Sequence, residues 1–125
     1  LDVTNQVFMD KKHIDKIVNF DSPQSNHLKK IFPFYVDFLT EFFSKEGMPT
    51  HDSSAIAYII DKTLFETIQY PIVVETLGIS RGKTWMGTGM DETNNNPWEK
   101  RRDVNICIEV NVQKVIDLII ERVAS

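Results

Sequence analysis

The order of apolar and polar residues predicts alternating strands and helices along the chain. The alternation of Val3, Asn5 and Val7 with Thr4, Gln6 and Phe8 within 2–8 is typical of a strand, whereas apolar residues recurring every three or four positions indicate helices. The predicted elements are, in order, a strand at 2–8, helices at 10–18, 26–46 and 52–60, strands at 70–76, 83–86 and 104–110, and a helix at 111–123. Strands interspersed with helices predict an α/β layered fold.

The predicted helix at 26–46 is the most aromatic part of the chain. Its positions 35, 38, 39 and 42 follow the i, i+3, i+4, i+7 spacing of one apolar face. We expect most of these rings to pack in the core; alternatively, a few line a pocket, where a flat ring can stack on a nucleobase or a sugar. Pro33 is expected to kink the helix or to divide it in two. The expected markers of helix ends are the caps Asp10 and Ser25 or Asn26, and the stop residue Gly47.

Composition narrows the class of protein. The 125 residues, 42% of them hydrophobic, suit one domain with its own core. A single cysteine, Cys107, excludes an intrachain disulfide framework, and its place in an apolar strand indicates a core residue rather than a nucleophile. The net charge of -4 argues against a general nucleic-acid surface, and no apolar run is long enough to cross a bilayer. We therefore expect a cytoplasmic protein with neither a nucleic-acid nor a membrane partner.

A candidate reactive pair follows the loop that begins at Gly47. His51 and Asp52 lie side by side, and apolar residues at helical spacing begin at Ile56. The pair is therefore expected on the first turn of a helix, where free N–H groups and the positive end of the macrodipole hold an anionic side chain. The simpler interpretation is that Asp52 or Thr50 caps the helix and that His51 is an ordinary loop residue.

Three stretches of sequence resemble the inosine-uridine preferring nucleoside hydrolases. They are the opening Leu1-Asp2-Val3-Thr4, the run 48–65 that contains the reactive pair, and the run Val73-Val74-Glu75-Thr76-Leu77-Gly78 with Ser80-Arg81-Gly82-Lys83-Thr84. Their order and rough spacing are those of the family's carboxy-terminal part, and they cover less than half of a complete member. The resemblance implies part of an open, mostly parallel sheet flanked by helices. Residues 1–125 would then be the carboxy-terminal portion of one such domain, without its amino-terminal half.

The resemblance also implies an activity and a site. Members of the family hydrolyse the N-glycosidic bond of ribonucleosides, and a bound Ca²⁺ holds the ribose hydroxyls and the attacking water. Asp52 matches a carboxylate ligand of that calcium. His51 matches the histidine proposed to protonate the departing base in the inosine-uridine branch, where the purine-preferring branch tends to carry Trp. Tyr35, Phe38 and Phe42 lie in a segment that resembles the mobile part closing over the base.

The sequence departs from the family pattern in two places. The aspartate cluster that builds most of the family's metal site has no counterpart here, and one aspartate cannot supply the six or more oxygens that Ca²⁺ takes. Thr84 is followed by Trp85-Met86-Gly87, where the family often has two apolar residues and an Asp; we expect little effect on catalysis.

A strand pattern from residue 1 indicates a chain cut from a longer protein. We therefore expect the isolated chain to be inactive, and its open sheet edge to be covered by the rest of the sheet or by a copy in a homo-oligomer.

Two other functions stay open. In a non-catalytic α/β binding or scaffold module, Asp52 would cap a helix and the aromatic face would be core. A dinucleotide-binding enzyme is favoured only by glycines at 78, 82, 87 and 89, which lack the spacing of a phosphate-binding loop and a following helix. An aspartate-rich turn upstream of Leu1 in the parent reading frame would favour the hydrolase. The preferred base is left open.

Overall fold

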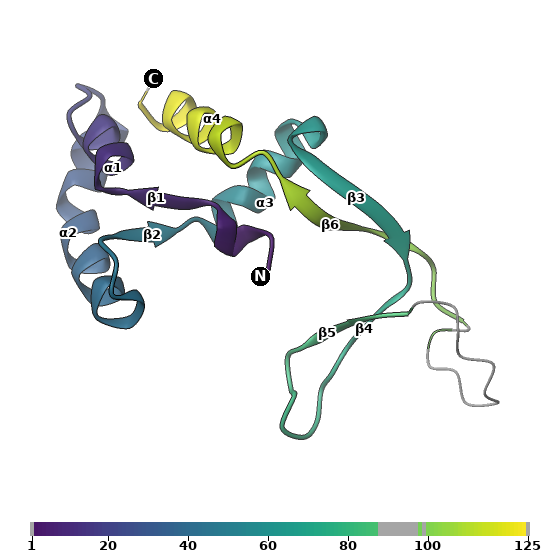
Figure 1. The fold of residues 1–125 in the computed structure, drawn as a ribbon. Helices are drawn as coiled ribbons and strands as arrows, with labels where there is room; N and C mark the ends of the chain where they lie inside the picture. Colours follow the sequence, from purple (N-terminus) through teal and green to yellow (C-terminus); the bar gives the residue numbers. More distant parts are fainter. Residues whose placement is uncertain (1, 88–97, 99, 125) are drawn as a thin grey trace. The chain divides into compact units, whose positions relative to one another are not determined.

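The computed structural model describes residues 2–87, 98 and 100–124 of the chain. They form two compact units, one made of residues 1–66 and 109–125 and the other of residues 67–108 (Figure 1). Helices and strands are mixed along the sequence, which confirms the α/β class. None of the described helices combines the length and the apolar character needed to span a membrane.

A short antiparallel strand pair runs through the first unit. β1 (Phe8–Asp10) pairs with β2 (Gly47–Pro49), so that Phe8 lies opposite Pro49. The other elements of this unit are η1 (Thr4–Gln6), α1 (Lys11–Val18), α2 (Pro23–Phe43), α3 (His51–Ile60), η2 (Lys62–Leu64) and α4 (Val112–Ala124). Figure 1 shows α2 at one end of the strand pair and α3 continuing from the other end of β2. The most deeply buried apolar side chains of the unit are Val7, Met9, Ile17, Val115 and Ile116.

The start of the chain folds as a turn, and the predicted strand over 2–8 is wrong. In η1, the Gln6 N–H donates to the Val3 carbonyl at 3.1 Å, and the Val7 N–H donates to the Thr4 carbonyl at 3.2 Å. Val3 and Val7 are both buried. Their four-residue separation places them on one side of a helical turn as well as on one face of a strand, so alternation alone does not separate the two structures.

Side-chain caps begin several of the helices, including α1 and α2. Asp10 caps α1, as predicted, by accepting a hydrogen bond from the backbone N–H of His13 at 3.1 Å. Ser22 caps α2: its Oγ accepts from the Ser25 N–H at 3.1 Å and donates to Ser25 Oγ at 3.0 Å. The proline that follows Ser22 suits the first helical position. The helix therefore begins three residues earlier than predicted, and neither Ser25 nor Asn26 is its cap.

α2 runs unbroken through Pro33, so the predicted division of this helix is wrong. It ends at Ser44, which adopts the left-handed conformation with a φ of 52°. Gly47 is therefore not the stop residue and belongs to β2. Its φ is 141°, and a Cβ there would clash with the backbone of β1. The close pairing of the two strands thus requires glycine at this position.

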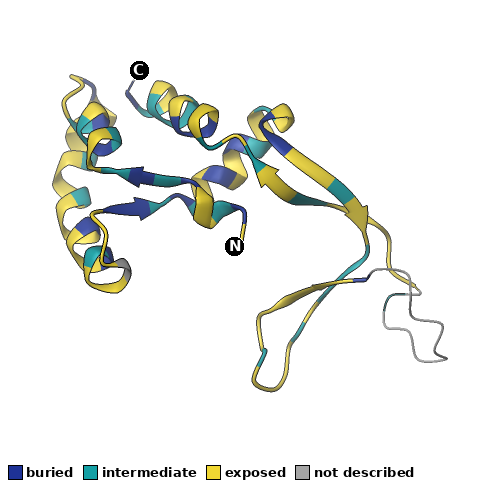
Figure 2. Cartoon of the chain, viewed as in Figure 1, coloured by how far each residue is buried: buried dark blue, intermediate teal, exposed yellow. Residues whose placement is uncertain are grey.

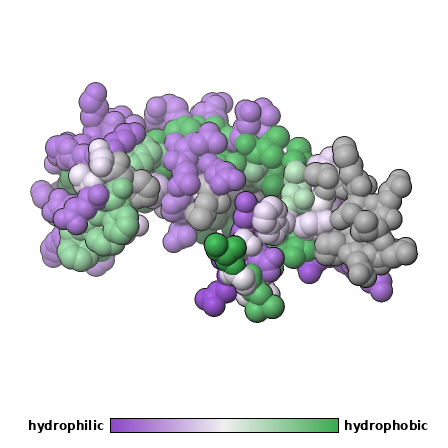
Figure 3. Space-filling view, turned by 60° about the horizontal axis from the view of Figure 1, so that its bottom comes forward, coloured by the Kyte–Doolittle hydropathy of each residue, from purple (hydrophilic) through white to green (hydrophobic). Residues whose placement is uncertain are grey.

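The aromatic face of α2 is turned to solvent within this unit. Val36 and Leu39 are buried, whereas Tyr35, Phe38 and Phe42 are 44%, 50% and 73% exposed (Figure 2). The prediction that most rings of this face pack in the core is therefore wrong for these three residues. Apolar side chains interrupt the polar surface elsewhere as well (Figure 3).

The second unit contains a hairpin and most of a longer strand pair. β4 (Ile72–Val74) and β5 (Thr84–Met86) pair antiparallel. β3 (Phe65–Tyr70) pairs with β6 (Val104–Val110), and their arrows in Figure 1 run in opposite directions. Each strand pair among the described residues is therefore antiparallel, and the parallel pairing that the resemblance implies is not formed between them.

Several predicted boundaries of this part of the chain are confirmed. The strands at 83–86 and 104–110 and the last helix each appear within one residue of their predicted limits. The predicted strand at 70–76 is instead interrupted at Pro71, which separates β3 from β4, and β3 itself was not predicted. The segment between β5 and β6 lies mostly outside the described residues.

Candidate functional site

His51 and Asp52 form the first turn of α3, as the sequence predicts. β2 leads into this helix through Thr50, which occupies the N-cap position but makes no side-chain capping bond. His51 is partly buried, and Asp52 is exposed. The carboxylate of Asp52 therefore lies at the positive end of the helix, where a negative charge is stabilised, without serving as the cap.

Thr50 fixes the first turn of α3 to the segment between η1 and β1. Its backbone N–H donates to the Val7 carbonyl at 2.9 Å, and its hydroxyl donates to the same oxygen at 3.1 Å. The hydroxyl of Ser54 in turn donates to the Thr50 carbonyl at 2.6 Å. All three residues are buried. The backbone that carries His51 is thus held by hydrogen bonds shielded from water.

The imidazole of His51 has a defined partner. Its Nδ1 lies 2.8 Å from the hydroxyl oxygen of Thr4, 47 positions earlier in the chain, and this hydrogen bond is partly buried. Thr4 belongs to η1, whose neighbours Val3 and Val7 are buried. The ring is therefore held through one nitrogen, which leaves Nε2 as the nitrogen that can face a ligand.

Asp52 has the right chemistry for one ligand of a hard cation, but it is a single carboxylate. Among the residues that the structure describes, no three His, Cys, Asp or Glu side chains form a group that could hold a metal ion. Ca²⁺ takes six to eight oxygen ligands. A calcium site that included Asp52 would therefore need most of its ligands from elsewhere.

The three aromatic residues singled out from the sequence lie on α2, away from the contacts of the pair. The rings of Phe38 and Phe42 pack against each other, with centroids 5.3 Å apart and planes inclined by 53°. The structure gives neither these rings nor Tyr35 a contact with His51 or Asp52. It therefore brings His51 and Asp52 together and leaves the aromatic group separate from them.

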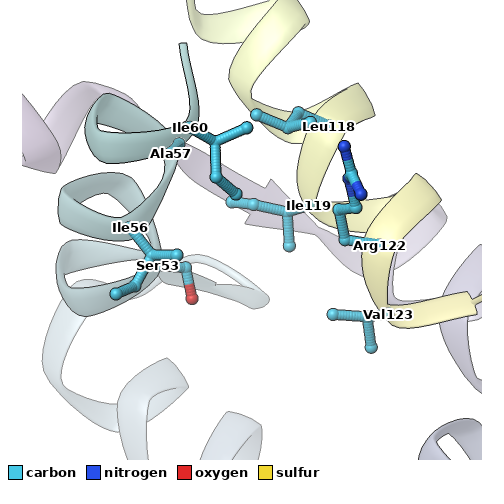
Figure 4. A pocket seen from close by; sticks show the side chains of 8 residues that line it. All are labelled: Ser53, Ile56, Ala57, Ile60, Leu118, Ile119, Arg122 and Val123. Carbon is cyan, nitrogen blue, oxygen red and sulfur yellow. The ribbon is translucent and has the colours of Figure 1, made fainter. Parts of the chain in front are cut away.

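An apolar groove lies beside the pair, between α3 and α4 (Figure 4). It has a volume of about 160 Å³ and is lined by Ser53, Ile56, Ala57, Ile60, Leu118, Ile119, Arg122 and Val123. Neither His51 nor Asp52 lines it. The groove therefore belongs to the side of α3 that packs on α4, and not to the candidate site.

The predicted core position of Cys107 is not confirmed, because its side chain is only partly buried. It lies in β6, is partly buried, and its burial raises the pKa of the thiol. A raised pKa lowers the fraction of the nucleophilic thiolate at neutral pH. This part of the chain therefore offers no activated thiol.

Sequence reasoning missed Thr4 and Thr50 as parts of the site. Thr4 lies in one of the motifs that carry the family resemblance, but nothing in a single sequence indicates a contact across 47 positions. For Thr50 the sequence indicates only a helix cap. Its actual bond to Val7 depends on how β1 and β2 pair, which local patterns do not specify.

Comparison with known proteins gives a consistent result. The family model described as inosine-uridine preferring nucleoside hydrolase matches residues 1–117. The chain is 27% identical over 123 residues to a probable uridine nucleosidase 2 from Arabidopsis thaliana, covering 98% of this chain and 38% of that protein. It is also 27% identical over 128 residues to the pyrimidine-specific ribonucleoside hydrolase RihA of Photobacterium profundum, covering 100% and 39% of the two chains.

Solved structures support the fold. The plant nucleoside hydrolase PpNRh1 superposes with a TM-score of 0.93 at 21% identity, covering all of this chain and 40% of that one. A purine-preferring ribonucleoside hydrolase from Gardnerella vaginalis superposes with a TM-score of 0.78 at 22% identity, covering 99% and 38%. The chain thus spans about two fifths of the length of these relatives.

Proposed function

The chain belongs to the inosine-uridine preferring nucleoside hydrolase family, and on that premise we propose that residues 1–125 are the carboxy-terminal portion of one nucleoside hydrolase domain. The whole protein then hydrolyses the N-glycosidic bond of inosine- or uridine-type ribonucleosides to free base and ribose, and this portion alone is inactive. The observation that carries the proposal is the pair His51–Asp52 on the first turn of α3, inside the matched residues.

His51 is the proton donor of the proposed reaction. As the glycosidic bond breaks, its electron pair passes to the base nitrogen, and Nε2 of protonated His51 gives a proton to the base. Water bonds to the anomeric carbon and releases a proton to solvent, which completes ribose, and His51 takes up a proton from solvent before the next cycle. The bond to Thr4 at Nδ1 supports this role, because it leaves Nε2 as the nitrogen available to the leaving group.

Asp52 is the calcium ligand that this chain contributes. Its exposed carboxylate suits a hard cation, and the remaining oxygen ligands come from the part of the protein outside this chain. When bound, calcium would position the ribose hydroxyls and lower the pKa of a water molecule. Asp52 itself contributes a fixed negative charge at the start of α3.

Tyr35, Phe38 and Phe42 are proposed to cover the nucleobase. Their exposure supports this role, because buried rings would be unable to reach a ligand. A flat base gains from stacking on an aromatic ring.

The role of His51 is tested by comparing two leaving groups. Replacing His51 by Ala should lower the rate of base release from uridine or inosine by about 100-fold or more, the usual contribution of a general acid. Hydrolysis of p-nitrophenyl riboside should fall far less, because p-nitrophenolate leaves without a proton. An equal loss on both substrates would show that His51 does not act as the acid.

The role of Asp52 is tested in the whole protein with added calcium. Asp52→Asn removes the charge at nearly constant size and should lower both calcium affinity and base release. Asp117→Asn on α4 is the matched control, since Asp117 is also exposed on a helix and accepts a local hydrogen bond from the side chain of Gln113. Unchanged calcium affinity in Asp52→Asn would contradict the ligand role.

A non-catalytic α/β binding or scaffold module is the second candidate. It is supported by the lack, among the described residues, of His, Cys, Asp and Glu side chains grouped for a metal. The exposed aromatic face of α2 does not support it, because in such a module that face was expected to be core. The activity assay separates the two, because a module of this kind releases no base.

The cellular location and oligomeric state of the protein are proposed from its composition and its exposed apolar residues. We place it in the cytoplasm, in nucleoside salvage, acting on a ribonucleoside without a nucleic-acid or membrane partner. The net charge of -4 and the single cysteine support this setting. Exposed apolar residues on α2 and α3 support a homo-oligomer.

A further inference from the structure

We propose that Thr4 is a positioning residue for His51: its hydroxyl binds Nδ1 and holds the imidazole in the one orientation that presents Nε2 to a ligand. That Thr4 orients the His51 ring is inferred from the structure alone. The effect of this orientation on catalysis rests on the function proposed above. The supporting contact is the 2.8 Å separation of Thr4 Oγ1 and His51 Nδ1.

A hydroxyl is suited to this position because it can both donate and accept. The two nitrogens of a neutral imidazole are one donor and one acceptor, and both are donors once the ring is protonated. Thr4 can therefore bond to Nδ1 in either tautomer of the neutral ring. A partner able only to accept, such as a carbonyl, would be unable to do so for both forms of the neutral ring.

The hydroxyl is itself held in place by its surroundings. Thr4 lies in η1, which is anchored in the core through buried Val3 and Val7. The carbonyl of Val7 accepts both hydrogen bonds from Thr50, the residue before His51. The hydrogen bonds between Thr50 and Val7 therefore join the two segments that carry Thr4 and His51. They lie three residues from Thr4 and one residue from His51. A threonine side chain also has few rotamers, which limits the directions of its hydroxyl.

The first test is a spectroscopic one that does not depend on activity. Long-range proton–nitrogen NMR spectra of the full chain report the hydrogen bonding and tautomers of each imidazole. The ring nitrogens of His51 should differ from those of exposed His27. In Thr4→Val they should move to the values of His27, and in Thr4→Ser they should stay near the original ones. Thr40→Val is the matched control, because the Thr40 hydroxyl donates to the Val36 carbonyl within α2.

The spectra can also overturn the inference. Ring nitrogens of His51 that are unchanged by Thr4→Val show that Thr4 does not hold the ring. If Thr4→Val does not fold, the spectra of the original chain and of Thr4→Ser decide: a His51 ring that matches His27 in both overturns the inference, and a distinct ring retained in Thr4→Ser supports it.

The second test measures the catalytic consequence in the whole protein. Thr4→Val should lower kcat about tenfold with KM within twofold, since misplacing an acid costs part of its contribution, and Thr4→Ser should restore most of kcat. Full kcat in Thr4→Val overturns the catalytic role. If the unaltered protein releases no base, the proposed function fails, whereas the NMR result still decides whether Thr4 orients His51.

Discussion

Thr50 donates two hydrogen bonds to one oxygen atom, the carbonyl of Val7, from its backbone N–H at 2.9 Å and from its hydroxyl at 3.1 Å. This relationship joins residues 43 positions apart and sets where α3 begins relative to η1. The orientation of His51 depends on it, because His51 is the next residue in the chain.

Replacing Thr50 by Val should weaken this junction. The backbone bond to Val7 remains, but a buried hydroxyl bond is lost, and such a bond contributes about 1 kcal/mol to the free energy of unfolding. Urea denaturation measures the change, and Thr50→Ser should retain most of the stability. An unaltered midpoint in Thr50→Val would show that the hydroxyl bond to Val7 adds nothing.

Replacing Ser22 by Ala should destabilise α2. The change removes the cap that accepts from the Ser25 N–H and leaves the buried Ser25 hydroxyl without this partner. Loss of a cap costs about 1 kcal/mol. Ser53→Ala, at an exposed position of α3, is the control and should change stability by less than about 0.5 kcal/mol in the same denaturation experiment. Equal effects of the two substitutions would contradict the capping role.

Alanine substitutions at Gly47 and Gly78 distinguish the cost of a steric clash from the cost of backbone strain. Both have a positive φ, of 141° and 73°, but a Cβ at Gly47 meets the Met9 carbonyl and the Phe8 ring, whereas one at Gly78 meets no atom within 4 Å. Gly78→Ala should therefore cost about 1 kcal/mol, from strain alone, and Gly47→Ala should cost clearly more by opening the β1–β2 pair. Thermal unfolding followed by circular dichroism compares them. A Gly47→Ala variant as stable as Gly78→Ala would contradict the tight pairing.

The lowered pKa of Asp61 predicts that the stability of the fold depends on pH. Hydrogen bonds from Thr63, first from its hydroxyl and then from its backbone N–H, lower the pKa of Asp61 from its ordinary value of 3.8. Because the folded-state pKa is the lower one, Asp61 stabilises the fold at pH values above 3.8, and this contribution disappears as the pH falls through the folded-state pKa. Thr63→Val should raise the pKa of Asp61 toward 3.8 in an NMR titration of its carboxyl carbon. A pKa that does not move would exclude the hydroxyl as the main cause.

How far the fold follows from sequence depends on how local each signal is. Asp10 is recognised as a cap because its partner, the His13 N–H, is three residues away. The strand predicted over 2–8 is wrong because the spacing of Val3 and Val7 fits two structures, and only the buried core selects the turn. β3 escapes prediction because its residues, apart from the first and the fourth, are exposed and carry little apolar pattern.

In the candidate site, too, local features could be predicted from the sequence and long-range contacts could not. The pair His51–Asp52 and its place on a helix start are local and could be predicted from sequence. The partner of the His51 ring, Thr4, depends on tertiary folding across 47 positions and could not. The faces of α2 were misassigned for a related reason: periodicity shows that Tyr35 and Phe38 share a face, but not whether this chain contains the surface that would cover them.

Release of free base from uridine and inosine by the whole protein in the presence of calcium tests the central claim most directly. The account predicts that both base and ribose appear in equal amounts, that the rate falls when calcium is chelated, and that it falls in Asp52→Asn but not in Asp117→Asn. A folded, calcium-supplied whole protein that releases no base from any ribonucleoside would contradict it.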